Sequence, residues 1–130
     1  MVSNFFSELP SDLSEEVFEK IAGNGSVKIE RIISNGQSTP AGQWYDQTQY
    51  EWVMLLKGEA TLEFDLTQYA HAEEASSKNA TCEAAITGSD LQKFVQLKPG
   101  DHLTIDPNQR HRVASTSTEG ETLWLAVFYD

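Results

Sequence analysis

Glu51 is the residue whose type and position point most directly to chemistry. It lies within residues 50–56, a run of aromatic and aliphatic residues typical of a β-strand. Because side chains on a strand alternate between its two faces, Glu51 points the same way as Val53 and Leu55, which are candidates for the core. A carboxylate in such surroundings is too costly to keep without a partner. The residue that meets Glu51 therefore decides whether this carboxylate only balances a charge or also takes part in proton transfer or ion binding.

The strand that carries Glu51 is predicted to be the first arm of a hairpin. Residues 44–56 are expected to form a long strand, and residues 60–64 a second strand that returns beside it. The tight turn between them contains Gly58, which supplies the conformational freedom that a short hairpin needs. This hairpin is the element that must position Glu51 against the rest of the chain.

The remaining segments predict an all-β domain with one short N-terminal helix. The helix is expected over residues 13–22, with Ser14 as its N-cap and Gly23 as its end. Residues 67–91 are polar and lack the periodicity of a core element, so they are predicted to be an insertion between strands. Short runs rich in β-branched and aromatic residues predict further strands over 27–34, 93–97, 102–105, 111–115 and 121–129. We expect a single domain over 1–130, with an N-terminal arm and helix over 1–23 and a barrel over 27–129.

Composition excludes several classes of partner. Nine Lys and Arg against twenty Asp and Glu give a net charge of −11, which argues against nucleic-acid binding. No apolar run is long enough to span a membrane, and no signal peptide is visible. Cys82 is the only cysteine, which rules out an internal disulfide and fits a reducing compartment. We therefore expect a cytoplasmic protein without a nucleic-acid or membrane partner.

Two spaced motifs carry a family resemblance. Glu51 is followed by Gly58, and Gly100 is followed by Pro107 and, eleven residues after the Gly, by His111. These residues resemble the Glu and Gly of the first signature motif of the cupin family, and the Gly, Pro and His of the second. The resemblance extends over most of the chain, and it implies a double-stranded β-helix, or jelly-roll, barrel.

The first motif departs from the cupin pattern where that pattern has a His-x-His pair. Counted back from Glu51, the two histidine positions hold Tyr45 and Gln47 in one register, and Trp44 and Asp46 in the other. In the second motif Asn108 stands at a usual glycine position, and we expect it to adopt the left-handed conformation that glycine takes there.

Cupins typically hold a divalent metal inside the barrel with three histidines and a glutamate. The resemblance implies that Glu51 and His111 occupy two of these ligand positions and that Gln47 takes a third. A carboxylate oxygen, an imidazole nitrogen and an amide oxygen suit Fe, Mn, Zn or Ni better than a metal that prefers thiols. The alternative is that Glu51 and His111 pair with each other across a polar pocket without a metal.

The resemblance also implies a pocket for a small organic ligand. Tyr45, Gln49, Val53 and Val113 are expected to line it, and in a catalysed reaction Glu51 and Tyr45 would handle protons. Two other interpretations remain open. In the first, the protein is a metal-free cupin that binds a small molecule without enzymatic turnover. In the second, it is a structural module whose dimer surface is its function.

The second face of the Glu51 strand predicts a homodimer. Tyr50, Trp52, Met54 and Leu56 share this face. In a barrel one face of each strand fills the interior, so an apolar outer face has to be covered. The predicted helix over 13–22 is too short to cover it all, and we expect a second subunit to cover the rest.

Overall fold

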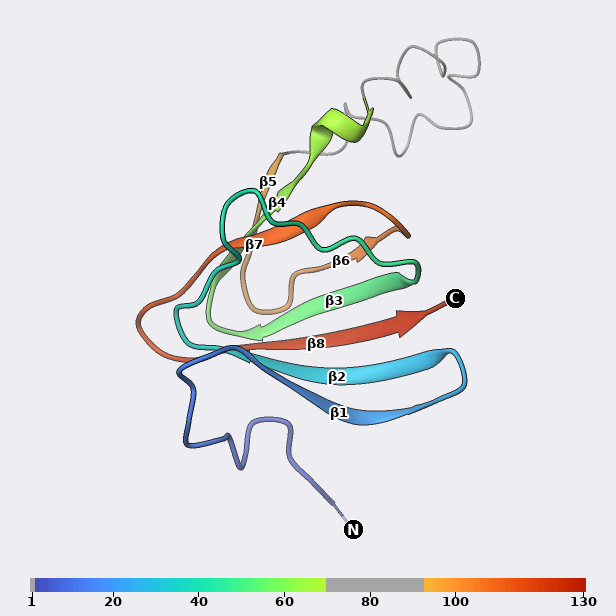
Figure 1. The fold of residues 1–130 in the computed structure, drawn as a ribbon. Helices are drawn as coiled ribbons and strands as arrows, with labels where there is room; N and C mark the ends of the chain where they lie inside the picture. Colours follow the sequence, from blue (N-terminus) through green and yellow to red (C-terminus); the bar gives the residue numbers. More distant parts are fainter. Residues whose placement is uncertain (1, 70–92) are drawn as a thin grey trace.

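The computed structural model describes residues 2–69 and 93–130, which form strands and one short 3-10 helix (Figure 1). The elements follow one another as β1 (Val17–Asn24), β2 (Val27–Ser34), β3 (Tyr50–Lys57), β4 (Ala60–Phe64), η1 (Leu66–Tyr69), β5 (Phe94–Leu97), β6 (His102–Ile105), β7 (His111–Thr116) and β8 (Thr122–Tyr129). The predicted all-β fold is confirmed. The predicted insertion over 67–91 lies outside the described residues except for its first three, which belong to η1.

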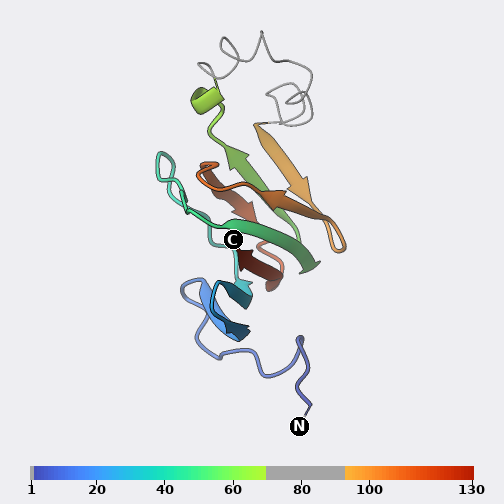
Figure 2. The ribbon, with the colours of Figure 1, turned by 90° about the vertical axis from the view of Figure 1, so that its right-hand side faces the viewer.

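The strands form two antiparallel sheets that enclose the core. The larger sheet has the order β1-β2-β8-β3-β6, and the smaller one the order β5-β4-β7. Figure 2 shows the smaller sheet packed over one part of the larger sheet. The N-terminal segment lies at the opposite end of the molecule from β4 and β5. Side chains from both sheets meet between them as a buried cluster that comprises Ile32, Val53, Leu55, Ala60, Leu62, Phe64, Leu97, Ile105, Trp124 and Ala126.

The tight turn predicted at Gly58 forms, but the predicted hairpin is wrong, because β3 and β4 do not pair with each other. β3 pairs with β6 and β8 in the larger sheet, and β4 pairs with β5 and β7 in the smaller one, so the turn connects the two sheets. Gly58 adopts φ 88° at its turn, a left-handed conformation that favours glycine. A Cβ atom at this position would lie 2.4 Å from Oγ1 of Thr122 and 2.9 Å from its Cα. Glycine is therefore required both by the backbone angle and by the close approach of β8.

The predicted helix over 13–22 is wrong, because these residues lead into a strand. β1 pairs with β2 from Val17↔Ile33 to Asn24↔Val27 through a two-residue turn. A ten-residue helix is marginal on its own, whereas the chain from Val17 onward gains backbone hydrogen bonds by pairing with β2. None of the described helices is long and apolar enough to cross a membrane.

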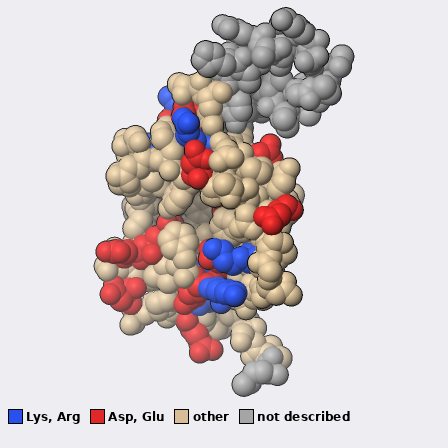
Figure 3. Space-filling model, turned by 45° about the vertical axis from the view of Figure 1, so that its right-hand side comes forward, with Lys and Arg blue, Asp and Glu red and all other residues tan. Residues whose placement is uncertain are grey.

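Most basic side chains of the described residues are paired with acidic ones. Figure 3 shows more acidic than basic side chains on the face that it displays, and each basic group there touches an acidic one. The ion pairs include Arg31–Glu19, Arg110–Asp46, Arg110–Asp65, Arg112–Glu63 and Lys57–Glu121. The arginine charges are thus already compensated by carboxylates of the chain itself.

Candidate functional site

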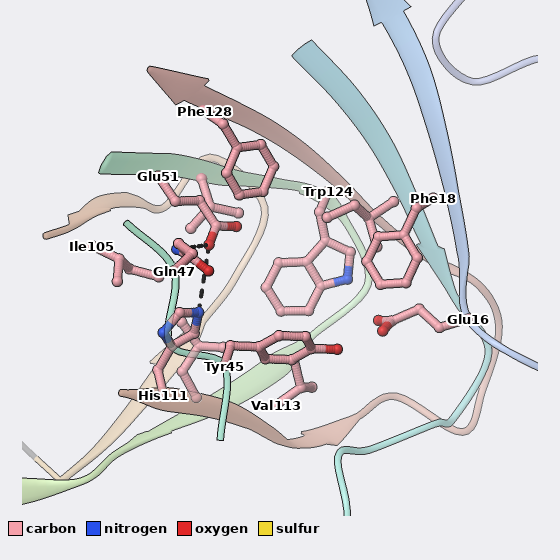
Figure 4. Close-up of a pocket in the computed structure, with 13 residues that line it drawn as sticks. Glu16, Phe18, Tyr45, Gln47, Glu51, Ile105, His111, Val113, Trp124 and Phe128 are labelled. Atoms are coloured by element: carbon pink, nitrogen blue, oxygen red, sulfur yellow. Dashed lines mark hydrogen bonds and ion pairs between the residues drawn. The ribbon is translucent and has the colours of Figure 1, made fainter. Parts of the chain in front are cut away.

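A cavity between the two sheets contains most of the residues that the sequence singles out. Its volume is about 520 Å³ with the open mouth included. Its walls are largely apolar, and five lining side chains carry polar groups, namely Glu16, Tyr45, Gln47, Glu51 and His111. Figure 4 shows these side chains reaching the cavity from β3, β7, the loop before β3 and the segment before β1. An apolar cavity with a few convergent polar groups is the usual form of a small-molecule site.

β3 presents Glu51 to this cavity from within the larger sheet. The backbone of Glu51 pairs with Ile105 of β6 on one side and with Phe128 of β8 on the other, so its direction is fixed by two strands. Its predicted burial is confirmed, since the residue is 8% exposed. The Oε1 atom accepts a hydrogen bond from Nε2 of Gln47 at 3.1 Å and lies 3.4 Å from Nε2 of His111. The buried carboxylate therefore meets both an amide and an imidazole.

His111 is oriented by its neighbours so that Nε2 faces Glu51. It opens β7, its backbone pairs with Phe64 of β4, and it is 5% exposed. Its Nδ1 lies 2.9 Å from the carbonyl oxygen of Gln109. Because a carbonyl oxygen only accepts hydrogen bonds, we assign a proton to Nδ1, which leaves the Nε2 lone pair of the neutral ring facing Glu51. An imidazole anchored in this way can bind an ion through Nε2, or pair with Glu51 once it takes up a second proton.

The segment before β3 bridges to β7 instead of extending β3. The predicted strand over 44–56 is therefore too long, since β3 begins at Tyr50. The backbone N–H of Tyr45 donates to the carbonyl of His111 at 2.7 Å, and the N–H of His111 donates back to the carbonyl of Tyr45 at 3.1 Å. This bridge places Tyr45 and Gln47 at the cavity. Of the two registers that the sequence left open for the histidine positions, the structure therefore selects Tyr45 and Gln47 over Trp44 and Asp46.

Asp46 faces outward and fixes the segment from the other side. Its Oδ1 accepts a hydrogen bond from Nδ2 of Asn108 at 2.9 Å, and its Oδ2 accepts one from Nε of Arg110 at 3.3 Å. The backbone N–H of Asn108 donates to the carbonyl of Gln47 at 2.7 Å. Asn108 has φ 60°, so the left-handed conformation predicted for it is confirmed. The Asp46 carboxylate thus holds the loop in place and does not reach the cavity.

Glu16 is a polar lining residue that the sequence did not single out. Its Oε2 accepts a hydrogen bond of 2.5 Å from Oγ of Ser34, which in turn accepts one of 3.1 Å from Nε1 of Trp124. Burial raises the pKa of the Glu16 carboxyl, the hydrogen bond from Ser34 opposes this rise, and the charge of Glu51 adds to it. Glu16 and Phe18 both line the cavity, which is the alternation of a strand. The spacing of Glu16 and Phe18 by two residues was the signal that could have placed both at the cavity, but a helix was predicted over these residues.

Tyr45 is a hydrogen-bonding group of the cavity that stays protonated. Burial raises the pKa of its phenol, and the negative charges of Glu16 and Glu51 raise it further. The hydroxyl is therefore neutral around pH 7 and is able to donate a hydrogen bond or a proton. In Figure 4 this hydroxyl points toward the Glu16 end of the cavity, away from His111.

The four predicted pocket residues do not all reach the cavity. Tyr45, Val53 and Val113 line it. Gln49 does not, because its Nε2 donates to the carbonyl of Ser26 at 2.7 Å and to the carboxylate of Asp130 at 3.2 Å. The prediction for Gln49 assumed that strand alternation continues before Tyr50, and the chain leaves the strand there.

The donor set at Glu51 fits a divalent ion in ligand type but supplies few protein ligands. Within the described residues there is no group of three or more His, Cys, Asp or Glu side chains that could hold a metal. The site offers one carboxylate and one imidazole, with the Gln47 amide as a third group whose oxygen would have to turn toward the ion. Such a mixed set matches Fe, Mn, Zn or Ni in ligand type, and it leaves several coordination positions for water or a ligand.

Among the comparisons with known proteins, the one with solved structures finds relatives. No protein-family model and no curated protein matches the sequence. Among solved structures, a "putative mannose-6-phosphate isomerase" from Ralstonia eutropha JMP134 is 35% identical, with a TM-score of 0.77 over 100% of this chain and 98% of that one.

Two more distant structures share the fold. A cupin superfamily protein from Desulfitobacterium hafniense DCB-2 is 15% identical, with a TM-score of 0.61 over 93% of this chain and 83% of that one. An RmlC-like cupin with a double-stranded β-helix fold from Methanocaldococcus jannaschii is 17% identical, with a TM-score of 0.57 over 94% and 86%. The two sheets, the Glu51 and His111 positions and these likenesses lead to one conclusion: the chain belongs to the cupin superfamily.

Proposed function

We propose that the protein binds a small organic ligand in the cavity between its sheets, together with a divalent metal ion at the end formed by Gln47, Glu51 and His111. The observation that supports this most strongly is the orientation of His111. Its Nδ1 is occupied by the carbonyl of Gln109 at 2.9 Å, and its Nε2 lies 3.4 Å from Oε1 of Glu51. Two donors of different charge that face each other at the end of an apolar cavity suit an ion shared between them.

The chain's own residues supply the rest of the site. An ion bound there would act as a Lewis acid toward a ligand oxygen. The protonated Tyr45 hydroxyl would donate a hydrogen bond to the ligand, and Glu51 would be the group that accepts a proton if the ligand is turned over. Val53 and Val113 contribute apolar surface to the lining of the cavity.

The name of the Ralstonia eutropha relative suggests a sugar phosphate, but the cavity does not suit one. In the described part of the chain no Lys or Arg side chain lines the cavity, whereas phosphate is usually met by such groups. We therefore do not carry that substrate over to this protein.

Metal analysis of the purified protein tests the proposed ion site. We expect Fe, Mn, Zn or Ni to be retained at a stoichiometry approaching one ion per chain, and His111→Ala to remove it. His102→Ala is the matched control, because His102 is exposed and lies against Trp52, with ring centroids 5.4 Å apart, outside the lining of the cavity. A stoichiometry near zero in all three proteins, or equal loss in both variants, would refute the metal site and favour the metal-free alternative.

The homodimer and the cytoplasmic location stay predictions. Tyr50 is 38% exposed, and the remaining outward residues of β3 are half-buried within the single chain, so a partner on this face has apolar surface left to cover. Sedimentation velocity is expected to give about twice the chain mass of 14.5 kDa; a single-chain mass at all concentrations would contradict the dimer. The lone Cys82 remains the reason for expecting a reducing compartment.

A further inference from the structure

The cavity has a second polar end, built around Glu16, which the proposed ion site does not use. Oε2 of Glu16 is fixed by the hydroxyl of Ser34, a residue with 0% exposure, and that hydroxyl is held by the indole N–H of Trp124. Within residues 2–69 and 93–130 the other oxygen, Oε1, receives no hydrogen bond. Since no described side-chain oxygen is both buried and unpartnered, Oε1 is reached by solvent and is open to a ligand group.

Aromatic rings surround this carboxylate. Figure 4 shows the Phe18 ring and the Trp124 indole on one side of it, and the Tyr45 hydroxyl turned toward it. Phe18 is 51% exposed although it lines the cavity, so it stands at the mouth and has apolar surface for a ligand to cover. The carboxylate attracts a positive charge, and the rings beside it offer apolar surface to the substituents of an ammonium group.

The charge of the lining points the same way. Two carboxylates, Glu16 and Glu51, and one imidazole, His111, are its titratable groups apart from the neutral Tyr45, and no described Lys or Arg lines it. The arginines of the described surface are engaged with acidic side chains, as Figure 3 illustrates for one face. No Lys or Arg of the described residues lies at the Glu16 end of the cavity, so an anionic group placed there would meet repulsion and a cationic one attraction.

We infer that the ligand of this cavity is a small organic cation, whose ammonium group lies against the Glu16 carboxylate between Phe18, Tyr45 and Trp124. The inference rests on the proposed ligand cavity and adds the chemical class of the ligand. The apolar or hydroxylated remainder of such a ligand would extend toward Glu51 and His111.

A pair of probes of equal shape tests the charge. Choline has a positively charged quaternary nitrogen where 3,3-dimethylbutan-1-ol has a neutral quaternary carbon. The difference between their affinities therefore measures the effect of the charge at nearly constant shape and volume. Calorimetric titration of the full chain at pH 8 is expected to show choline binding about tenfold more tightly, the order that a contact with a charged group contributes. Mannose 6-phosphate and mannose form the corresponding anionic pair, and the phosphate is expected to weaken binding.

Glu16→Gln separates the role of the charge from that of the shape. The amide keeps the size of the side chain and its hydrogen bond to Ser34. The variant is expected to lose the roughly tenfold preference for choline and to bind 3,3-dimethylbutan-1-ol as the unmodified protein does. Glu15→Gln is the matched control, because Glu15 is exposed, is not part of the cavity lining, and undergoes the same change of charge. It is expected to keep the preference.

Three outcomes would overturn the inference: equal affinity for choline and its neutral counterpart, tighter binding of mannose 6-phosphate than of mannose, or no binding of choline. A choline preference that survives in Glu16→Gln would also overturn it. None of these outcomes affects retention of a metal at Glu51 and His111, which Glu16→Gln leaves in place. The failure of this inference is therefore distinguishable from the failure of the proposed function.

Discussion

Replacing Phe64 with alanine is expected to lower the free energy of unfolding by about 3–5 kcal/mol. Phe64 is 1% exposed and belongs to the buried cluster between the two sheets. It also pairs with His111 across β4 and β7, with ring centroids 6.1 Å apart. The substitution therefore leaves a void beside the imidazole as well as removing apolar contacts. Urea denaturation measures the loss, and the same protein should bind the proposed ion more weakly because His111 is less firmly held.

Phe94→Ala is the matched control for this substitution. Phe94 lies on β5 of the same sheet and is 51% exposed, so the identical change of side chain there is expected to alter stability by no more than about 0.5 kcal/mol. Equal destabilisation by the two substitutions would show that Phe64 is not in the core, and it would contradict the described packing of the two sheets.

Glu51→Gln is expected to reduce affinity for a divalent ion by about a hundredfold or more, since even indirect ligand partners contribute ten- to a hundredfold. The amide keeps the shape of the side chain and still presents an oxygen to Nε2 of Gln47, so the fold should persist. What is lost is the negative charge facing His111. Calorimetric titration with Zn²⁺ measures the change.

Glu121→Gln controls for the loss of one negative charge elsewhere. Glu121 pairs with Lys57 at 3.1 Å near the surface, and its substitution changes the net charge by the same amount without touching the cavity. We expect its Zn²⁺ affinity to equal that of the unmodified protein. If both variants lose affinity to the same extent, the ion is attracted by the overall negative charge of the chain and is not bound at Glu51.

Much of the larger architecture follows from local patterns in the sequence. Alternation along β3 correctly separates the buried face, with Glu51, Val53 and Leu55, from the outward one, because a strand has only two faces. The turn at Gly58 can be predicted from the sequence because few residues other than glycine tolerate its positive φ angle. The pairing of Glu51 with His111, 60 residues further along the chain, came from the cupin resemblance, since no local pattern reports such a contact.

The N-terminal error has a specific physical cause. Residues 13–22 have a helix-like start and end, but Asn24 and Gly25 precede β2, and an Asn-Gly pair between strand-forming segments is a strong hairpin signal. Because the chain is extended here, Glu16 just before β1 and Phe18 on β1 both reach the cavity. Helical spacing conceals this relation, which is why the second polar end of the cavity was not predicted.

The end of β3 was mispredicted for a different reason. Residues 44–49 have the composition of a strand, yet they pair with β7 at Tyr45 and are held from outside by Asp46. Partners distant in sequence determine where a strand stops, and composition does not report them. Gln49 was predicted to line the pocket because the strand was expected to continue before Tyr50. Tyr45 and Gln47 reach the pocket through the bridge to His111 instead.

Anomalous diffraction from crystals grown with Zn²⁺ tests the central claim most directly, because it locates the ion. We expect one strong peak inside the cavity, at about 2.0–2.2 Å from a carboxylate oxygen of Glu51 and from Nε2 of His111. Peaks confined to surface carboxylates, or a cavity in which Glu51 and His111 contact each other without an ion at saturating Zn²⁺, would contradict it.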